Sequence, residues 1–257
     1  MIEKTVIISD IHLPHHDPKA VSTMFNFVKG FKPHKVIIAG DMMDFSGISR
    51  HADASAANRI KSELAVGNAF LDELRKVAGA KCEIVMLGGN HDKRIRSFVE
   101  LNAPQLEGML TIEEELRLEE RGISFTEYSG DKAYWLSKKL AVMHGFAHGQ
   151  NYAAETLRKY NVSCIVGHAH KIQVFTSPTV GQSGQQARIC YGNSCLVPVK
   201  DVSYMTAPSG WTQGLTVALV DKKSGAFNVY PVVMTDHLIR WCDSKVYGPT
   251  KKGWIGK

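Results

Sequence analysis

The sequence predicts an α/β protein in which two packed sheets are flanked by helices. Three observations support this fold class. Short β-branched runs alternate with amphipathic stretches in the first half, the chain from residue 172 onward reads as strands, and no linker-like stretch separates the halves. We therefore expect one domain over residues 1–257, with a basic tail at about residues 243–257.

The first half has a β-α-β-α-β order. Its strands are expected at residues 4–9, 35–39 and 82–87, and its helices at residues 18–28 and 56–77. Pro18 suits the first turn of a helix, where its missing N–H costs nothing. Because helical crossovers join parallel strands, these three strands should be parallel. Two further helices are expected at residues 94–101 and 112–120.

The second half changes character. Short strands are expected at residues 123–128, 133–136, 140–144 and 164–166, with a helix at residues 152–160. Further strands are expected at residues 173–176, 187–191, 215–220 and 226–231. The turn at residues 221–225, Asp-Lys-Lys-Ser-Gly, predicts that the last two strands form a hairpin.

The charge balance favours an anionic partner. The formal net charge is +6, and the tail after Asp243 contains four lysines and no acid: Lys245, Lys251, Lys252 and Lys257. We expect this tail to be a frayed, solvated terminus. The alternative is a contact with substrate or nucleic acid, in which Trp254 would act as a stacking ring.

The cysteines and the hydropathy pattern indicate a cytoplasmic protein without membrane contact. The five cysteines contain no C-x-x-C pair, so we expect scattered core thiols in a reducing compartment. The first apolar run, Val6 to Ile8, is too short for a signal peptide, and no apolar stretch reaches the length of a membrane span.

Metal-type side chains follow five successive predicted strands. The motifs are Asp10-Ile11-His12, Gly40-Asp41-Met42-Met43-Asp44, Gly89-Asn90-His91-Asp92, His144-Gly145 and Gly167-His168-Ala169-His170. An α/β sheet collects its site residues at the carboxyl ends of its strands, so these side chains should meet. Carboxylate, imidazole and amide groups suit divalent manganese, iron or zinc, and the lack of cysteine argues against a structural zinc site.

The five motifs resemble the signatures of the calcineurin-like metallophosphoesterase superfamily: D-x-H, G-D-x-x-D, G-N-H-D, H-G and G-H-x-H. They span Asp10 to His170, about two thirds of the chain. The long helix after Asp44 and the sequence G-N-H-D-K-R are similar to small stand-alone members from bacteria and their phages. The resemblance implies a four-layer αββα sandwich with two mixed sheets, and metal-dependent hydrolysis of phosphate esters in a bacterial or phage-infected cell.

The resemblance also implies a role for each motif residue. The ligands of one divalent ion would be Asp10, His12 and His170, and those of a second would be Asn90, His144 and His168, with Asp41 as the bridge. Mn²⁺ is the expected metal, with Fe²⁺, Zn²⁺, Ni²⁺ or Mg²⁺ as alternatives, and a water activated by the two ions would attack the phosphorus. His91 would protonate the leaving oxygen and Asp44 would orient it, while Asp92 would fix the loop.

Substrate contacts are expected from polar residues near these motifs. Arg94 lies with Lys93 and Arg96 at a helix start, where cations do not complement the helix dipole, so a phosphate-facing role competes with simple exposure. His148, four residues after His144, is a second candidate.

Other polar residues are weaker candidates. His15 and His16 are expected in a solvated loop, although they could line the mouth of the pocket, and Arg50 and His51 follow the second motif. Substrate choice should depend on the loops at residues 45–57, 146–152 and 179–186.

One departure from the superfamily pattern bears on the substrate. Phe45-Ser46 stands where Ser/Thr protein phosphatases carry Arg-Gly, and the Arg grips the phosphate there. We therefore expect a phosphodiesterase acting on nucleotides or nucleic acid. The alternatives are a phosphomonoesterase for a small phosphorylated metabolite and a non-catalytic, metal-bound scaffold that presents its surface to a protein.

Overall fold

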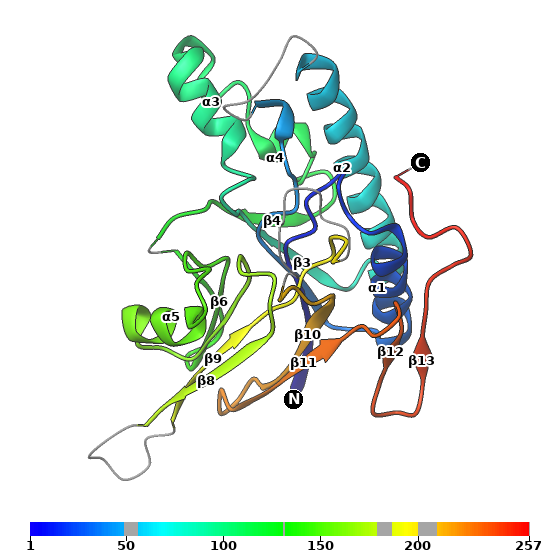
Figure 1. Cartoon of the computed structure of the whole chain (residues 1–257), viewed down its shortest axis with the longest axis vertical. Coiled ribbons are helices and arrows are strands. Elements are labelled where there is room, and N and C mark those ends of the chain that lie inside the picture. Colours follow the sequence, from blue (N-terminus) through cyan, green and yellow to red (C-terminus); the bar gives the residue numbers. More distant parts are fainter. Residues whose placement is uncertain (49–55, 131, 179–186, 200–209, 257) are drawn as a thin grey trace.

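Two sheets with helices on their outer faces make up the computed structural model (Figure 1). The structure describes residues 1–48, 56–130, 132–178, 187–199 and 210–256, and only the backbone at 56–58. The helices are α1 (Pro18–Phe31), α2 (Ala56–Ala78), α3 (Arg94–Asn102), α4 (Ile112–Glu115) and α5 (Tyr152–Tyr160), with single turns η1 (Ser46–Ile48) and η2 (Pro104–Leu106).

The strands alternate with these helices in the first half and dominate the second. They are β1 (Ile2–Ile8), β2 (Lys35–Ala39), β3 (Glu83–Leu87), β4 (Ile123–Thr126), β5 (Tyr134–Ser137), β6 (Leu140–Met143), β7 (Cys164–Val166), β8 (Gln173–Ser177), β9 (Arg188–Gly192), β10 (Gly214–Asp221), β11 (Phe227–Val233), β12 (Ile239–Arg240) and β13 (Val246–Tyr247). Most of them match the expected ranges to within two residues, and β10 and β11 form the expected hairpin.

The six-stranded sheet has the order β11-β10-β1-β2-β3-β4. Strands β1, β2, β3 and β4 are parallel, which confirms the crossover prediction, whereas β10 pairs antiparallel with β1 and β11 antiparallel with β10. The last long strands of the chain therefore complete the sheet that the first strand begins. The five-stranded sheet has the order β5-β6-β7-β9-β8 and is also mixed.

Alternation along the strands creates four layers. Successive side chains of a strand point to opposite faces. On β2, Val36 and Ile38 pack into the core shared with α1 and α2, whereas Ile37 and Ala39 pack into the core between the two sheets. A third core joins the outer face of the five-stranded sheet to α5. The four-layer αββα sandwich is thereby confirmed, with α1 and α2 on one side and α5 on the other (Figure 1).

The helix expected at residues 112–120 is much shorter than predicted. Thr111 caps α4, because its hydroxyl accepts a hydrogen bond from the backbone N–H of Glu114, but the helix ends at Glu115. Arg117 has a φ of 46°, which breaks the helical path. Glu119 and Glu120 would also place negative charge at the negative end of a longer helix.

The prediction of a frayed C-terminal tail is wrong. Strands β12 and β13 pair with each other, and the following segment returns across α1 and α2. The indole of Trp254 lies edge-on to Phe25 and Phe70, with ring centroids 5.8 and 5.6 Å apart. The backbone N–H of Trp254 also donates to the carbonyl of Pro18, at 2.8 Å. Apolar packing fixes this end of the chain, which composition alone did not reveal.

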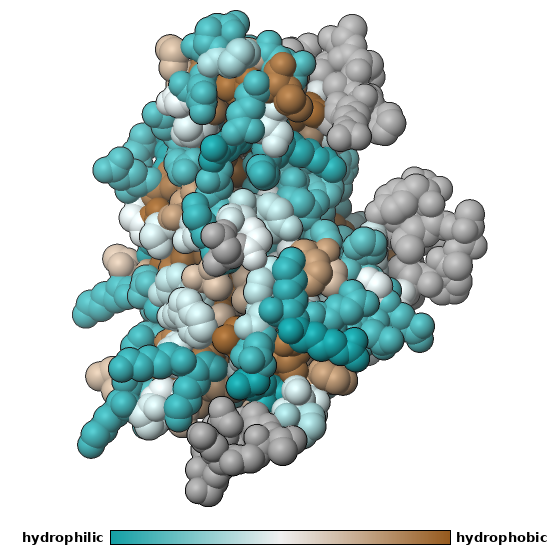
Figure 2. All heavy atoms as spheres, turned by 90° about the vertical axis from the view of Figure 1, so that its left-hand side faces the viewer, coloured by the Kyte–Doolittle hydropathy of each residue, from teal (hydrophilic) through white to brown (hydrophobic). Residues whose placement is uncertain are grey.

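The surface is mixed in character. Figure 2 shows one face, which is mostly hydrophilic with an apolar area near its upper end. Around α3 and η2 the exposed apolar side chains are Phe98, Leu101, Leu106 and Met109. Within the described ranges, no helix is long and apolar enough to span a membrane.

Candidate metal centre

The expected ligand loops meet at the carboxyl ends of β1, β2, β3, β6 and β7. Three groups of side chains there have ligand atoms within 4.8 Å of one another and could hold a metal ion. The groups are Asp10, His12 and His170; Asp41, His144 and His168; and His12, Asp44 and His91. The structure therefore brings together residues that lie up to 160 positions apart in the chain.

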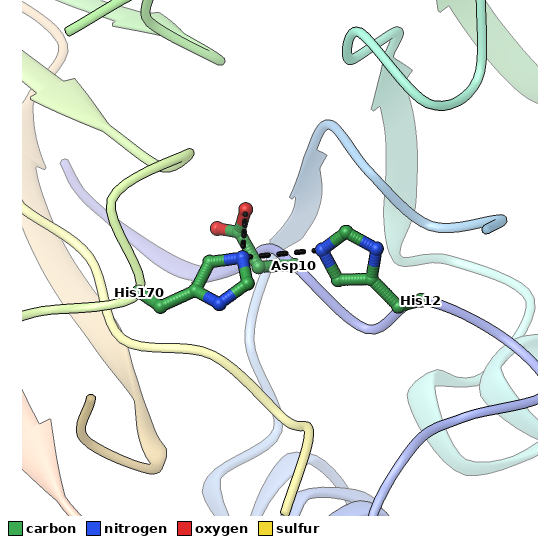
Figure 3. A group of neighbouring side chains, drawn as sticks. All are labelled: Asp10, His12 and His170. Atoms are coloured by element: carbon green, nitrogen blue, oxygen red, sulfur yellow. Dashed lines mark hydrogen bonds and ion pairs between the residues drawn. The ribbon is translucent and has the colours of Figure 1, made fainter. Parts of the chain in front are cut away.

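The first group joins the two sheets. Nε2 of His170 lies 3.1 Å from Nε2 of His12 and 3.2 Å from Oδ1 of Asp10 (Figure 3). Asp10 is fully buried, and its carboxylate also accepts the backbone N–H of His168. Two imidazole nitrogens and a carboxylate oxygen thus face a common point, which suits a divalent cation.

In the second group, Asp41 and His144 are buried and His168 is half-buried. Nδ1 of His144 lies 3.0 Å from the carbonyl of Ala39, an arrangement in which Nδ1 carries the proton and Nε2 is left as a lone pair. That Nε2 lies 3.2 Å from Oδ2 of Asp41 and 3.0 Å from Oδ1 of Asn90. The ring of His168 packs edge-on to His144. Three acceptors converge, so a proton or a metal ion must lie among them.

The electrostatics of this group favour a bound cation. Burial lowers the pKa of His144, but the Asp41 carboxylate outweighs it and raises that pKa to about 9. Burial and the neighbouring His144 lower the pKa of His168 to about 4. The ring of His168 is therefore neutral near pH 7 and can donate a nitrogen lone pair to a metal ion. The nitrogen and oxygen donors at both groups therefore fit divalent metal ions.

Asp41 lies between the two groups. Its Oδ2 is 3.2 Å from Nε2 of His144 in the second group and 3.8 Å from Nε2 of His12 in the first. Its other oxygen accepts the backbone N–H of His91 at 2.8 Å. One carboxylate oxygen is consequently within reach of both ligand sets.

His91 lies at the rim of the site, between the carboxylate of Asp44 and the guanidinium of Arg94. Nδ1 of His91 is 2.9 Å from Oδ1 of Asp44, and Nε2 is 3.3 Å from Nη2 of Arg94. Burial disfavours the charged ring, but the hydrogen bond to Asp44 prevails and raises the pKa of His91. Arg94 also donates to the backbone carbonyl of Asp44 at 2.7 Å. Arg94 therefore faces the site instead of bulk solvent.

The backbone around these residues is unusual. Five of the expected ligands have φ values between 50° and 69°: Asp10, His12, Asp41, His168 and His170. Side chains other than glycine rarely adopt this region, and such positions concentrate at functional sites. Gly89 meets a different constraint, because a Cβ there would lie 2.1 Å from Oδ1 of Asp41.

Asp92 fixes two of the ligand loops against each other. Its buried carboxylate accepts the backbone N–H groups of Met43 and Gly89 at 2.9 and 2.8 Å, and of Met42 at 3.3 Å. Met42 and Met43 belong to the loop after β2, and Gly89 belongs to the loop after β3. This contact fits the expected loop-fixing role.

Of the three histidines expected at or near the mouth of the pocket, two are exposed and one is buried. His148 is exposed, but its ring centroid lies 5.9 Å from that of His168, so it remains at the edge of the site. His15 is also exposed, with Nε2 3.8 Å from Asp44. The solvated loop predicted for His16 is wrong, because His16 is buried and Nε2 lies 3.1 Å from the carbonyl of Trp254.

Several expected loop contacts have no structural counterpart here. Arg50, His51 and the loop at residues 179–186 lie outside the described residues, as does most of the loop at 45–57. Lys93 and Arg96 begin α3 beside Arg94, and Arg96 pairs with Glu100 and Glu127. Arg96 is thus held by acids away from the ligand groups.

Three contacts of the site could not be predicted from the sequence. Nδ1 of His12 lies 3.2 Å from Oδ1 of Asp44, so Asp44 contacts His12 as well as His91. The ring of Trp211 lies 4.4 Å from that of His170, centroid to centroid. Asn193 is fully buried behind the site, where it bonds to Ser9 and Thr216. These partners come from distant segments, and no motif spacing relates them.

Known proteins resemble this chain over most of its length. The Gene 54 proteins of Mycobacterium phages D29 and L5 are 27% and 26% identical over 252 residues, which cover 91% of this chain and 95% of each phage protein. A single mutant of Vps29 from Entamoeba histolytica is a similar solved structure, with a TM-score of 0.41 and 14% identity, covering 90% of this chain and 99% of that one. Vacuolar Protein Sorting 29 from Cryptosporidium parvum has a TM-score of 0.42 and 14% identity, covering 89% and 96%.

A match to a family model shows to which protein family the chain belongs. The model described as calcineurin-like phosphoesterase matches residues 3–172, which contain all the ligand groups described above. These His and Asp groups support a metal-dependent phosphoesterase. The chain belongs to the calcineurin-like phosphoesterase family.

Proposed function

We propose that this protein is a metal-dependent phosphodiesterase that acts on nucleotides or nucleic acid. The observation that carries the proposal is the meeting of two His/Asp ligand groups with a His91–Asp44 pair at one edge of both sheets. The diester preference is supported by Phe45, which is fully buried at the position where protein phosphatases carry a phosphate-gripping Arg. The buried Phe45 ring cannot contact a phosphate dianion.

We infer that two divalent ions bind here, with Mn²⁺ as the proposed metal. Asp10, His12 and His170 would hold one, Asn90, His144 and His168 the other, and Asp41 would contact both. When bound, such a pair of ions supplies an activated water and neutralises developing charge on the phosphoryl group. The close approach of Asp41 Oδ2 to both histidine sets supports the bridging role.

His91 would act on the leaving oxygen. Asp44 accepts a hydrogen bond from Nδ1, which fixes the tautomer and supports a proton on Nε2 at neutral pH. A protonated Nε2 cannot also accept a bond from Arg94, so the Arg94 guanidinium would move off the ring. It would then be free to bind a phosphoryl oxygen, which is the role we assign to it. His148, at the opposite rim, is the second candidate for a substrate contact.

The compartment and partners follow from the same proposal. All five cysteines are free thiols, and four of them are buried, as in a protein kept in a reducing cytoplasm. We propose the cytoplasm of a bacterial or phage-infected cell as its location. Nucleotides or nucleic acid are the proposed partners, in line with the net charge of +6.

A comparison of two chromogenic esters tests the proposal. Bis-p-nitrophenyl phosphate and p-nitrophenyl phosphate share a leaving group and differ in whether the phosphate is a diester. With Mn²⁺, we expect the diester to have at least about tenfold higher kcat/KM, and we expect chelation of the metal to abolish both rates. A preference for the monoester would contradict the diester assignment. Inactivity on both esters and on oligonucleotides, with Mn²⁺, Ni²⁺ and Mg²⁺ alike, would favour the scaffold alternative.

A further inference from the structure

A cavity of about 400 Å³ lies near the start of β10. Its wall includes Trp211, the same residue whose ring lies 4.4 Å from His170, centroid to centroid. The other walls come from the chain after β9 and the chain after β11, together with Asp17. Cavities that bind small molecules commonly have volumes of about 300–1,000 Å³. The space can therefore hold a group the size of a nucleobase.

Backbone contacts hold Trp211 beside His170. The backbone N–H of Thr212 donates to the carbonyl of His170 at 2.9 Å, and the Thr212 hydroxyl accepts the N–H of Ile172 at 3.2 Å. One backbone bond and one side-chain bond therefore tie Thr212, the residue after Trp211, to the segment at residues 170–172. A rigid aromatic wall next to a ligand group is suited to stacking, because little conformational entropy is lost when a flat ring binds to it.

The charges divide the region into two parts. Among the residues that the structure describes, the ten that line the cavity include Asp17, Asp236 and His237, but no Lys or Arg. Lys171, in contrast, follows His170 directly, and its side chain lies along Gly210, next to Trp211. A phosphate would be repelled from the acidic cavity and attracted toward the ligand groups and Lys171. A neutral ring would be accepted by the cavity.

We propose that this cavity is the subsite for the base of a nucleotide substrate, with Trp211 as its stacking surface. The proposal rests on the phosphodiesterase function proposed above and specifies its substrate class. The phosphate would lie at the ligand groups, and the base would reach past His170 to Trp211. Trp211 is then a residue that determines specificity.

Two diesters with a common leaving group provide the test. Thymidine 5′-(p-nitrophenyl) phosphate and methyl p-nitrophenyl phosphate both release p-nitrophenolate, and only the first carries a base. We expect the wild type to prefer the nucleoside diester by at least about tenfold in kcat/KM. Trp211→Ala should bring the two kcat/KM values to within about threefold of each other, and Trp211→Phe should keep part of the preference. Trp135→Ala, a control at a half-exposed position on β5, should keep all of it.

Each contrary outcome has a definite meaning. If Trp211→Ala slows both diesters equally, Trp211 only positions His170 and the subsite is refuted. If the wild type shows no preference for the nucleoside diester, the subsite is also refuted.

A binding measurement separates the subsite from the reaction. If neither diester is hydrolysed, the phosphodiesterase proposal fails, and calorimetric titration with thymidine 5′-monophosphate and with ribose 5-phosphate still tests the cavity. Tighter binding of the base-containing probe, lost in Trp211→Ala, would support the subsite independently of catalysis. Equal binding of the two probes by the wild type would overturn it.

Discussion

Asp44 contacts two imidazole rings, those of His12 and His91, to which we assign different roles. Its Oδ1 lies 3.2 Å from Nδ1 of His12 and 2.9 Å from Nδ1 of His91. The carboxylate therefore sets the tautomer of an expected metal ligand and of the expected acid at the same time. Burial would raise the pKa of Asp44, but its two histidine partners prevail and lower it, so Asp44 stays ionised at neutral pH.

Replacement of His91 should separate catalysis from metal binding. We expect His91→Ala to lower kcat by about 10²–10⁴-fold, because the leaving oxygen would lose its proton donor. Metal content, measured by atomic emission after gel filtration, should remain that of the wild type. Asp41→Asn is the matched contrast, since loss of a carboxylate shared by both ligand groups should release metal. Unchanged turnover of His91→Ala would contradict the assigned role.

Replacement of Asp44 should affect both properties. Asp44→Asn would leave Nδ1 of His12 and Nδ1 of His91 without a carboxylate partner, so we expect a fall in kcat together with about 10–100-fold weaker metal affinity. Competition with a chromogenic chelator measures the affinity. If metal affinity were unchanged while kcat fell, Asp44 would serve His91 alone.

For single residues, the sequence identifies which side chains belong to the site, but it does not identify the side chains that contact them. D-x-H and G-D-x-x-D identify side chains that follow strands, and the sheet then brings them together. The contact of Asp44 with His12, or of Trp211 with His170, depends on how loops from different strands turn. Loop geometry of that kind follows from tertiary packing, which no spacing encodes.

The loops after β2 and β3 act as one element because Asp92 joins them. We expect Asp92→Asn to lower the free energy of unfolding by about 1–3 kcal/mol, since an amide group cannot accept all three backbone N–H bonds. Urea unfolding monitored by circular dichroism provides the measurement. Asp72→Asn is the control: Asp72 is an exposed residue of α2 that pairs with Arg121, and a pair with a solvent-exposed carboxylate contributes about 0–1 kcal/mol. Equal losses in both variants would refute a special role for Asp92.

The start of α1 provides a pH-dependent element. Asp17 caps the helix through Oδ1 and accepts bonds from Gln213 and His237 through Oδ2. Burial would raise the pKa of Asp17, but these bonds outweigh it and lower the pKa below the ordinary 3.8. A lowered folded-state pKa means that the ionised group stabilises the fold above pH 3.8 and that this contribution is lost as the pH falls further.

Asp17→Asn isolates that contribution, because Asn keeps the cap and removes the charge. The difference in unfolding free energy between wild type and variant should be present at pH 7 and should shrink below about pH 4. Urea titrations at pH 7, 5, 4 and 3 measure it. A difference that does not change with pH would mean that the charge of Asp17 is unimportant.

Elements with a strong hydrophobic period were predicted well. The bounds of β2, α5 and β7 match the expectation to the residue, because a buried run or an amphipathic stretch there ends at a polar or turn residue. The helix prediction for residues 112–120 failed for a physical reason: Ile112 and Leu116 are buried at helical spacing, yet the left-handed turn at Arg117 breaks the helical path before the buried Leu118. Buried apolar residues do not by themselves show where a helix gives way to a turn.

At the scale of the whole molecule, distant parts of the chain support one site. The prediction of two sheets with helices outside was correct, but the return of β10 and β11 to the side of β1 could not be foreseen, since strand order in a mixed sheet depends on packing. Likewise, the lysines of the C-terminal segment predict a solvated tail, which the structure contradicts. Trp254 decides its position, and one aromatic residue gives no periodic signal.

Trp254 should therefore matter to global stability. We expect Trp254→Ala to lower the free energy of unfolding by about 3 kcal/mol, because it removes a ring packed on Phe25 and Phe70. Trp135→Ala, at a half-exposed ring, should change it by less than about 1 kcal/mol. Thermal unfolding followed by calorimetry compares the two. Similar Tm values for both variants would restore the view of a loose tail.

The pairing of β1 with β10 has a consequence for synthesis on the ribosome. Translation delivers the chain from its N-terminus at roughly 5–20 residues per second, so β1, which ends at Ile8, is made well before β10, which begins at Gly214. The antiparallel partner of β1 is β10, so this edge of β1 stays unpaired until residues 214–221 have been made. Completion of the six-stranded sheet consequently comes after all the ligand loops, which end at His170, have left the ribosome's catalytic centre.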